Sequence, residues 1–131
     1  MTISHCHGDS NQLWTNEKRD SYSYWTFSRY GGKCLTVRNA SRLDSEAIIQ
    51  YTCNDGANER WLYLPYYSAG ATYTLTLPNG RKYTSKNVFQ IQNVNSSRCI
   101  TVKNASHFSG NTLLQYNCSS PGLNVWVQYP A

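Results

Sequence analysis

The sequence predicts an all-β domain built on a threefold repeat. Two stretches of 20 residues, 34–53 and 99–118, begin and end with cysteine and share C-x-T-V-x-N-A-S at the front and Q-Y-x-C at the back. Short segments rich in Val, Ile, Thr and aromatic residues alternate with Gly, Asn and Pro along the chain. No stretch keeps a helical period for three turns. Many short strands in a threefold repeat favour a closed or nearly closed barrel, which hides the sheet edges.

The spacing between cysteine and tryptophan indicates the third copy. Trp61 follows Cys53 by 8 positions, and the same spacing joins Cys118 to Trp126. The segment CHGDSNQLW at 6–14 repeats it once more. Only the second half of this first copy is present, so its opening cysteine is expected at about position −13, ahead of this chain. We expect the three tryptophans to occupy equivalent places in the core.

An insertion precedes the third copy. Trp61 and Cys99 are 38 positions apart, whereas Trp14 and Cys34 are 20 apart, which leaves 18 extra residues. Within them TYTLTLPNGRKYTS alternates around a PNG turn and predicts a β-hairpin. The hairpin is a surface decoration, a contact arm for a partner, or a cover for an open edge of the sheet. Strands are expected at 22–28, 33–37, 47–53, 60–64, 72–77, 81–85, 88–94, 98–102, 112–118 and 125–129.

Composition narrows the function classes. The 131 residues carry a net charge of +5, and the Lys and Arg residues are scattered, which argues against a nucleic-acid surface. No apolar run of about 18 residues could span a membrane, and no signal-peptide pattern opens the sequence. The three His and seven carboxylate residues show no catalytic or metal-binding spacing. The sequence therefore predicts no enzyme, no metal site and no cofactor.

The repeat also predicts the disulfides. Each complete copy holds an early and a late cysteine, so Cys34 is expected to pair with Cys53, and Cys99 with Cys118. Two pairs of buried free thiols are the alternative. Paired cysteines indicate an oxidising compartment and hence a secreted, extracellular protein. Cys6 has lost its partner with the front of the first copy and is expected to be a free thiol.

The pattern C-L-x-V…Q-Y/W-x-C…N-Q-x-W resembles the ricin B-type lectin repeat, which folds as a β-trefoil. The stretch IQYTCNDGANERW is similar to the trefoil carbohydrate-binding modules of secreted actinobacterial proteins. The resemblance covers nearly the whole chain and implies one β-trefoil domain with a pseudo-threefold repeat. It divides residues 1–131 into a partial first repeat at 1–21, a second repeat at 22–66, the inserted hairpin at 67–87 and a third repeat at 88–131.

The resemblance implies that the domain is open at its front. A ricin-type trefoil has four strands in each copy, so this chain would lack about 20 to 30 residues, including one barrel strand. An unpaired barrel edge is unfavourable unless something covers it. Either the chain is a fragment of a longer protein, or another segment or a partner chain supplies the strand.

Three ligand positions in each copy are also implied by the resemblance. They are an Asp two residues after the first cysteine, an aromatic residue two before the second, and the Asn before the tryptophan. An aromatic ring meets the apolar face of a hexose, and planar carboxylate or amide groups meet its hydroxyls. Asp44 and Asp55, in the loops that flank Tyr51, are possible substitutes for the Asp. The candidate residues are thus Thr36, Tyr51 and Asn58 in the second copy, and Thr101, Tyr116 and Asn124 in the third.

These residues predict a non-catalytic carbohydrate-binding lectin module of a secreted protein or assembly, with a glycan or polysaccharide as its partner. The threonines weaken the prediction, because a carboxylate makes charge-assisted hydrogen bonds about twice as strong as neutral ones. The alternative is a protein-interaction scaffold, or the targeting subunit of a toxin or inhibitor, whose sugar sites are degraded. A protein partner could also cover the open N-terminal edge. Neither nucleic acid nor a membrane span is expected.

Overall fold

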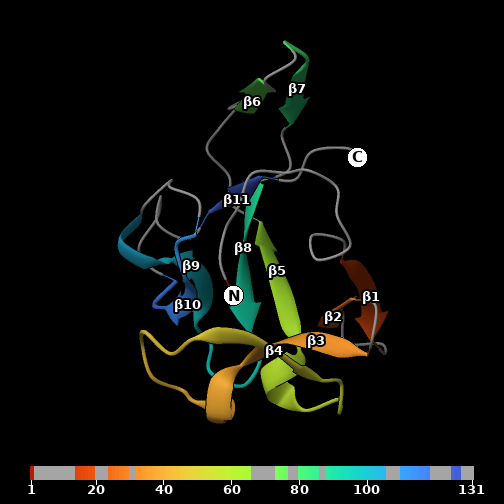
Figure 1. Cartoon of the computed structure of the whole chain (residues 1–131), viewed down its shortest axis with the longest axis vertical. Coiled ribbons are helices and arrows are strands. Elements are labelled where there is room, and N and C mark those ends of the chain that lie inside the picture. The colour runs from red at the N-terminus through yellow and green to blue at the C-terminus, as the bar shows by residue number, and fades with distance from the viewer. Residues whose placement is uncertain are drawn as a thin grey trace.

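The computed structural model (Figure 1) describes residues 1, 14–19, 24–29, 32–65, 73–76, 80–85, 88–105, 110–118 and 125–127. Within these ranges the chain forms strands and three 3-10 turns but no α-helix, so the predicted all-β class is confirmed. Among the same residues, no helix is long and apolar enough to cross a membrane. The 3-10 turns are η2 (Arg38–Ala40), η3 (Ala57–Glu59) and η4 (Lys103–Ala105).

Among the described residues nine strands form one sheet, and five of them make up its centre, each antiparallel to its neighbour. Figure 1 shows β5 and β8 side by side at its centre. The strands are rich in β-branched and aromatic residues, as the sequence predicted, except for the first, TNEKR, which the sequence pattern missed. In spatial order they are β1 (Thr15–Arg19), β2 (Tyr24–Arg29), β5 (Trp61–Pro65), β8 (Val88–Asn93) and β11 (Trp126–Val127).

Each complete copy adds a hairpin to this sheet. In the second copy β3 (Lys33–Val37) pairs with β4 (Ile48–Thr52), and β3 continues from β2. In the third copy β9 (Cys99–Val102) pairs with β10 (Leu113–Tyr116), and β9 continues from β8. Both hairpins place the first cysteine of the copy directly opposite its tyrosine. Where the structure describes them, the predicted strands are confirmed, with ends that differ by no more than two residues.

The two hairpins also bend alike. Asn39 in η2 has φ 56° and ψ 22°, and Asn104 in η4 has φ 58° and ψ 21°. Asparagine tolerates this left-handed conformation better than most side chains, because its short amide can bond to the nearby backbone. The Asn-Ala pair shared by the two copies therefore specifies the same turn after β3 and after β9.

The core lies where the hairpins meet the sheet. Trp61 is completely buried, and its indole nitrogen donates to the carbonyl of Leu35, 3.0 Å away. Trp126 makes the equivalent bond of 3.0 Å to the carbonyl of Ile100, and in each case the acceptor lies 26 positions upstream. Trp14 packs against the same core, so all three tryptophans contribute to it as predicted. The buried cluster consists of Leu35, Val37, Ile48, Trp61, Ile100 and Leu113.

Met1 is the residue of the first copy that packs against this core beside Ile48 and Leu113. It precedes Cys6 by five positions, as Ile48 precedes Cys53 and Leu113 precedes Cys118. The α-amino group of Met1 donates to the carbonyl of Ile48 at 3.1 Å, and the amide of Leu113 donates to the carbonyl of Met1 at 2.8 Å. Three equivalent residues, one from each copy, thus meet around a pseudo-threefold axis.

The predicted inserted hairpin is present as a sheet of its own. Strands β6 (Tyr73–Thr76) and β7 (Lys82–Ser85) pair from Tyr73 opposite Ser85 to Thr76 opposite Lys82. The hydroxyls of Thr74 and Thr84 lie 3.2 Å apart across this pair. Gly80 has φ +85°, a conformation that favours glycine, and it belongs to the predicted PNG turn. Figure 1 shows the hairpin set apart from the central sheet.

An aromatic cluster bridges three strands of the sheet. The ring of Tyr63 contacts those of Trp25, Phe27 and Phe89 edge-on, with centroids 5.3, 5.8 and 4.7 Å away. Burial raises the pKa of the Tyr63 phenol above its ordinary value of 10.0. The side-chain amide of Asn16 donates to the phenolic oxygen at 3.2 Å, which opposes this rise in pKa.

Tyr63 therefore gives the domain a pH-dependent contribution to stability. Because its pKa is higher in the folded state, the contribution is complete below about pH 10 and is lost as the pH rises through the folded pKa. Tyr63→Phe is expected to make the free energy of unfolding fall less steeply above about pH 10. Urea unfolding of both proteins across that range measures the two slopes. Parallel pH profiles would show that the phenol of Tyr63 titrates alike in the folded and unfolded chains.

Candidate functional site

Both predicted disulfides are present. Cys34 is bonded to Cys53, and Cys99 to Cys118, each with a Cα–Cα distance of 5.1 Å. Each bond anchors the strand that carries a candidate tyrosine, because the second cysteine of each pair lies two positions after that tyrosine. Cys6, the predicted free thiol, lies outside the described residues.

The two candidate tyrosines face solvent. Tyr51 on β4 is 57% exposed, and Tyr116 on β10 is 38% exposed. Each lies opposite the first cysteine of its copy, Cys34 or Cys99, across the hairpin. An exposed tyrosine on a strand fixed by a disulfide is a ready contact surface, since little conformational freedom remains to be lost on binding.

The threonines at the Asp position are buried instead. Thr36 is 3% exposed and Thr101 is 4% exposed. The hydroxyl of Thr36 donates to the carbonyl of Cys34 at 2.9 Å, and that of Thr101 donates to the carbonyl of Cys99 at 3.0 Å. Both hydroxyls thus bond to their own strand, and a ligand would reach them only after the covering residues moved. Their role as ligand contacts stays a prediction.

A buried glutamate shapes the loop that follows Tyr51. Glu59 is 1% exposed, and its Oε2 accepts hydrogen bonds from the backbone amides of Asn54 at 2.9 Å and Asp55 at 3.1 Å. Asp55 is held there with φ 65°. The repeat pattern did not predict a role for Glu59. The sequence did contain a signal, because the second copy reads NERW where the first reads NQLW. Glu59 thus stands where the first copy has Gln12.

Asn58 fastens the same loop to the hairpin. Its side-chain amide donates to the carbonyl of Val37 at the end of β3, 3.1 Å away. Gly56 lies tightly beside it, because a Cβ there would come within 2.9 Å of Asn58 Oδ1 and 3.0 Å of Asn54 Oδ1. One of the two N–H groups of the Asn58 amide is therefore bonded to the backbone. Its second N–H and its side-chain oxygen are both candidate contacts for a ligand.

The two substitute carboxylates lie in different surroundings. Asp55 is on the same loop as Asn58, and its exposed carboxylate lies 3.9 Å from Nη2 of Arg60. Asp44 instead lies 3.3 Å from Nε of Arg98, a residue of the third copy. Asp44 thus lies at the boundary between the second and third copies. Of the two carboxylates, only Asp55 lies on the same loop as another candidate residue, Asn58.

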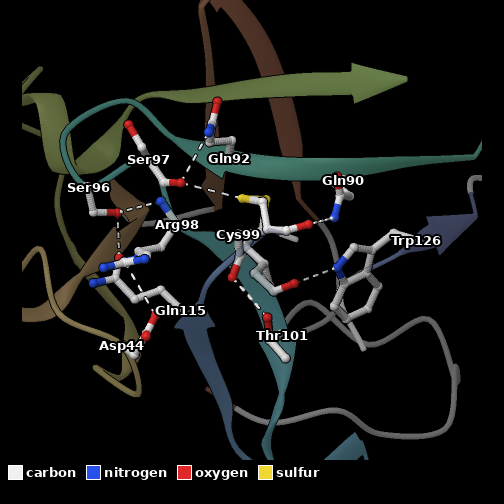
Figure 2. Close-up of a disulfide and its surroundings, with 12 residues drawn as sticks. Asp44, Gln90, Gln92, Ser96, Ser97, Arg98, Cys99, Thr101, Gln115 and Trp126 are labelled. Carbon is white, nitrogen blue, oxygen red and sulfur yellow. Dashed lines mark hydrogen bonds and ion pairs between the residues drawn. A yellow bond between two sulfur atoms is a disulfide. The ribbon is translucent and has the colours of Figure 1, made fainter. Parts of the chain in front are cut away.

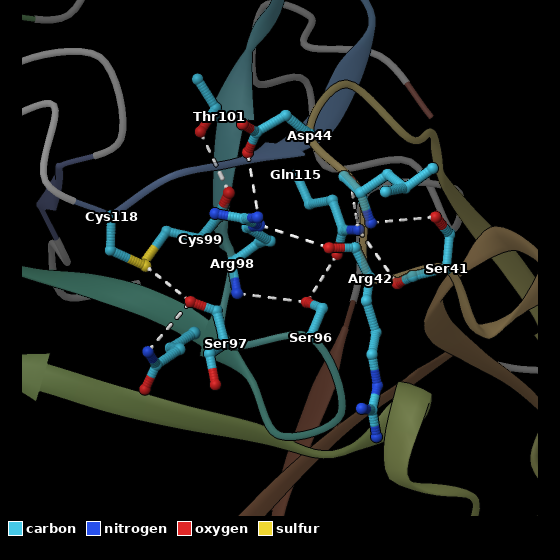
Figure 3. Close-up of polar contacts among 12 residues, drawn as sticks. Ser41, Arg42, Asp44, Ser96, Ser97, Arg98, Cys99, Thr101, Gln115 and Cys118 are labelled. Atoms are coloured by element: carbon cyan, nitrogen blue, oxygen red, sulfur yellow. Dashed lines mark hydrogen bonds and ion pairs between the residues drawn. A yellow bond between two sulfur atoms is a disulfide. The ribbon is translucent and has the colours of Figure 1, made fainter.

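Gln115 organises this boundary, as Figure 3 shows. It is completely buried, and its amide nitrogen donates to the carbonyls of Ser41 at 3.0 Å and Leu43 at 2.7 Å. The hydroxyl of Ser96 donates to its Oε1 at 2.7 Å. These bonds fix the loop between β3 and β4, which presents Leu43 to solvent with 71% of its surface exposed.

The third copy repeats the local bonds of the second around its disulfide. Figure 2 shows the hydroxyl of Thr101 directed to the backbone of Cys99 and the indole of Trp126 reaching the strand beside it. The side-chain amide of Gln90 on β8 also donates to the carbonyl of Cys118 at 2.6 Å. Asn124, the remaining predicted ligand residue of this copy, lies outside the described residues. The structure therefore describes the candidate ligand residues of the second copy more completely than those of the third.

Among the described residues, no group of three His, Cys, Asp or Glu side chains is placed to hold a metal ion.

Comparison with solved structures identifies the fold. The designed threefold-symmetric protein ThreeFoil superposes with a TM-score of 0.73 at 25% identity, over 95% of this chain and 76% of its own. The exo-β-1,3-galactanase 1,3Gal43A from Clostridium thermocellum gives a TM-score of 0.69 at 19% identity, over 94% of this chain and 23% of its own. The Haemophilus ducreyi cytolethal distending toxin gives 0.56 at 17% identity, over 90% and 60%. The fold is a β-trefoil, as predicted, with its sheet open among the described residues.

No curated protein matches the chain significantly. A family model described as "Ricin-type beta-trefoil lectin domain-like" matches residues 10–84, which is more than half of the chain. The repeated cysteines, tyrosines and tryptophans and the open trefoil sheet agree with that match. The chain belongs to the family of ricin-type β-trefoil lectin-like domains.

Proposed function

We propose that this domain is a non-catalytic carbohydrate-binding module and that the second copy carries its binding site. The observation that carries the proposal is Tyr51, which is 57% exposed on a strand fixed by the disulfide of its own copy. Membership of a lectin-like family supports the ligand class. The two disulfides support an oxidising compartment, so we further propose that the protein is secreted.

The loop after Tyr51 supplies the polar half of the proposed site. The tyrosine ring offers an apolar face to the C–H side of a hexose. The exposed carboxylate of Asp55 and the side-chain oxygen of Asn58 accept hydrogen bonds from sugar hydroxyls. Glu59 and Asn58 hold the loop through backbone bonds of 2.9 to 3.1 Å, so the acceptors are positioned before a ligand arrives.

Thr36 limits the affinity of such a site. A carboxylate at its position would accept charge-assisted hydrogen bonds, whereas its buried hydroxyl is bonded to the carbonyl of Cys34. Asp55 replaces that charge from the neighbouring loop. We therefore expect weak binding of single sugars, with dissociation constants of about a millimolar.

A second function is favoured by one specific observation. Leu43 is 71% exposed on a loop held firmly by Gln115, with Arg42 and Asp44 on either side. A rigid loop that presents an apolar side chain between charged neighbours suits a protein partner with an apolar pocket. In this alternative the domain is a protein-interaction scaffold or a targeting subunit, and Leu43→Asp removes binding of the partner while leaving sugar binding unchanged.

Tyr51→Ala is expected to weaken carbohydrate binding by tenfold or more, because about 1.4 kcal/mol of ring contact corresponds to that factor. A glycan array with the full chain identifies the ligand, and titration of wild type and variant with that ligand measures the change. Tyr116→Ala is the matched control, since it removes the equivalent exposed ring of the third copy. Both substitutions are at exposed positions and should change the free energy of unfolding by less than about 0.5 kcal/mol. If Tyr116→Ala lost binding and Tyr51→Ala kept it, the site would lie in the third copy, and the proposal would be wrong.

A further inference from the structure

A turn of the third copy is bonded to the loop that follows Tyr51 in the second. The turn joins β8 to β9 and begins at Asn93, which is completely buried. The backbone amide of Asn93 donates to the carbonyl of Arg98 at 2.7 Å and closes the turn. The side-chain oxygen of Asn93 accepts from the backbone amides of Asn95 at 3.1 Å and Ser96 at 3.2 Å. This oxygen is therefore used within the third copy.

The nitrogen of the same side chain reaches the second copy. It donates to the backbone carbonyl of Asn58 at 3.0 Å. Beside it, the backbone amide of Val94 donates to the carbonyl of Arg60 at 2.9 Å. Asn58 and Arg60 flank Glu59, whose carboxylate accepts from the amides of residues 54 and 55. Two donors of the third copy thus fix the end of the loop, and from that end Glu59 holds its beginning.

The burial of Asn93 decides how it can act on a ligand. None of its surface is exposed, so its side chain does not reach a sugar on the surface. Without its donor the carbonyl of Asn58 would lose a hydrogen bond, and the loop would have to be ordered when the ligand binds, which lowers affinity. The repeat does not predict this contact, because the second copy has Ser28 where the third has Asn93.

We propose that Asn93 is a positioning residue for the carbohydrate site of the second copy. The proposal rests on the proposed function, in which Asp55 and Asn58 contact sugar hydroxyls. Asn93 touches no sugar and holds the loop that carries both residues in the geometry that binds. The contacts with the sugar therefore come from the second copy, whereas their placement depends on a residue of the third.

Asn93→Asp removes the donor and keeps the acceptor. Its carboxylate still accepts from the amides of the turn, but an ionised carboxylate cannot donate to the carbonyl of Asn58. We expect the affinity for a single sugar to fall by about threefold to tenfold, the range that corresponds to one net hydrogen bond. Amide chemical-shift titrations of the full chain with galactose, glucose, mannose and xylose, each tested singly, measure the change. Without sugar, hydrogen exchange at the amides of residues 54 and 55 should become about tenfold faster.

Asn95→Asp is the matched control. It loses a bond of the same kind, because the side-chain amide of Asn95 donates to the carbonyl of Ala40 at 2.9 Å and joins the same turn to a different loop of the second copy. We expect this variant to bind the sugar as wild type does and to keep slow exchange at residues 54 and 55. Asn93→Ser carries no charge and repeats the test if the aspartate prevents folding.

The outcomes separate the positioning role from the proposed function. If wild type bound one of the four sugars and the Asn93 variants bound it equally well, the positioning role would be refuted and the proposed function would stand. An equal loss of affinity in Asn95→Asp would also refute it, since the effect would then belong to the stability of the whole turn. If wild type bound none of the four sugars, the proposed function would fail, and the positioning role would fail with it.

Discussion

Trp61→Ala is expected to lower the free energy of unfolding by about 3–5 kcal/mol. The side chain is completely buried in the cluster formed with Leu35, Val37 and Ile48, so its removal leaves a cavity that the surrounding hairpin can only partly fill. It also leaves the carbonyl of Leu35 without the indole donor at 3.0 Å. Since small domains are stable by only about 5–15 kcal/mol, this change removes a large share of the total.

Urea unfolding followed by circular dichroism measures the effect. Trp126→Ala is the matched control, because it loses the equivalent bond to Ile100 from a side chain that is only partly buried. Its cost should be smaller, at about 1–3 kcal/mol. An equal cost for the two variants would mean that the described core does not centre on the second copy.

The second large effect is expected at Gln115. Gln115→Ala should cost about 2–4 kcal/mol, because it empties a buried site and leaves the carbonyls of Ser41 and Leu43 without their donor. The hydroxyl of Ser96 loses its acceptor as well. The loop that presents Leu43 should loosen, and hydrogen exchange of its amides should become faster.

Gln50 offers a control within the same chain. It precedes Tyr51 as Gln115 precedes Tyr116, but it is exposed. Gln50→Ala should therefore change the free energy of unfolding by no more than about 0.5 kcal/mol. If the two alanine variants were equally stable, the bonds from Gln115 to the loop at 41–43 would contribute nothing net to the fold.

The contrast between these two glutamines marks the limit of prediction from the repeat. The repeat spacing predicted the fold class, both disulfides and the core tryptophans, because those features recur identically within each copy. The burial of Gln115 depends on a neighbouring copy, and two identical Q-Y pairs cannot reveal which one has that neighbour. Asp44 is a similar case, since its carboxylate lies beside Arg98 of the next copy at 3.3 Å. Strand β1 was missed because its sequence, TNEKR, has no apolar alternation and its partner β2 makes it a strand.

The candidate site could be predicted only in part. Tyr51 is exposed, as a contact residue must be, but alternation does not explain this, because its neighbours Gln50 and Thr52 on β4 are exposed as well. Its role as a ligand contact stays a prediction. The inward bond of the Thr36 hydroxyl depends on the side chain's rotamer and on the loop that covers it, which a motif does not specify. Glu59 was overlooked because a carboxylate normally indicates a surface position, whereas here two backbone amides hold it inside.

The central claim is that the second copy binds carbohydrate through Tyr51 and the loop that follows it. The most direct measurement is an amide chemical-shift titration of the nitrogen-15-labelled full chain with the ligand that the glycan array identifies. We predict saturable shifts in residues 51–60, absent in Tyr51→Ala and retained in Tyr116→Ala. Shifts confined to residues outside this loop, or no shift with any sugar at millimolar concentration, would contradict the account.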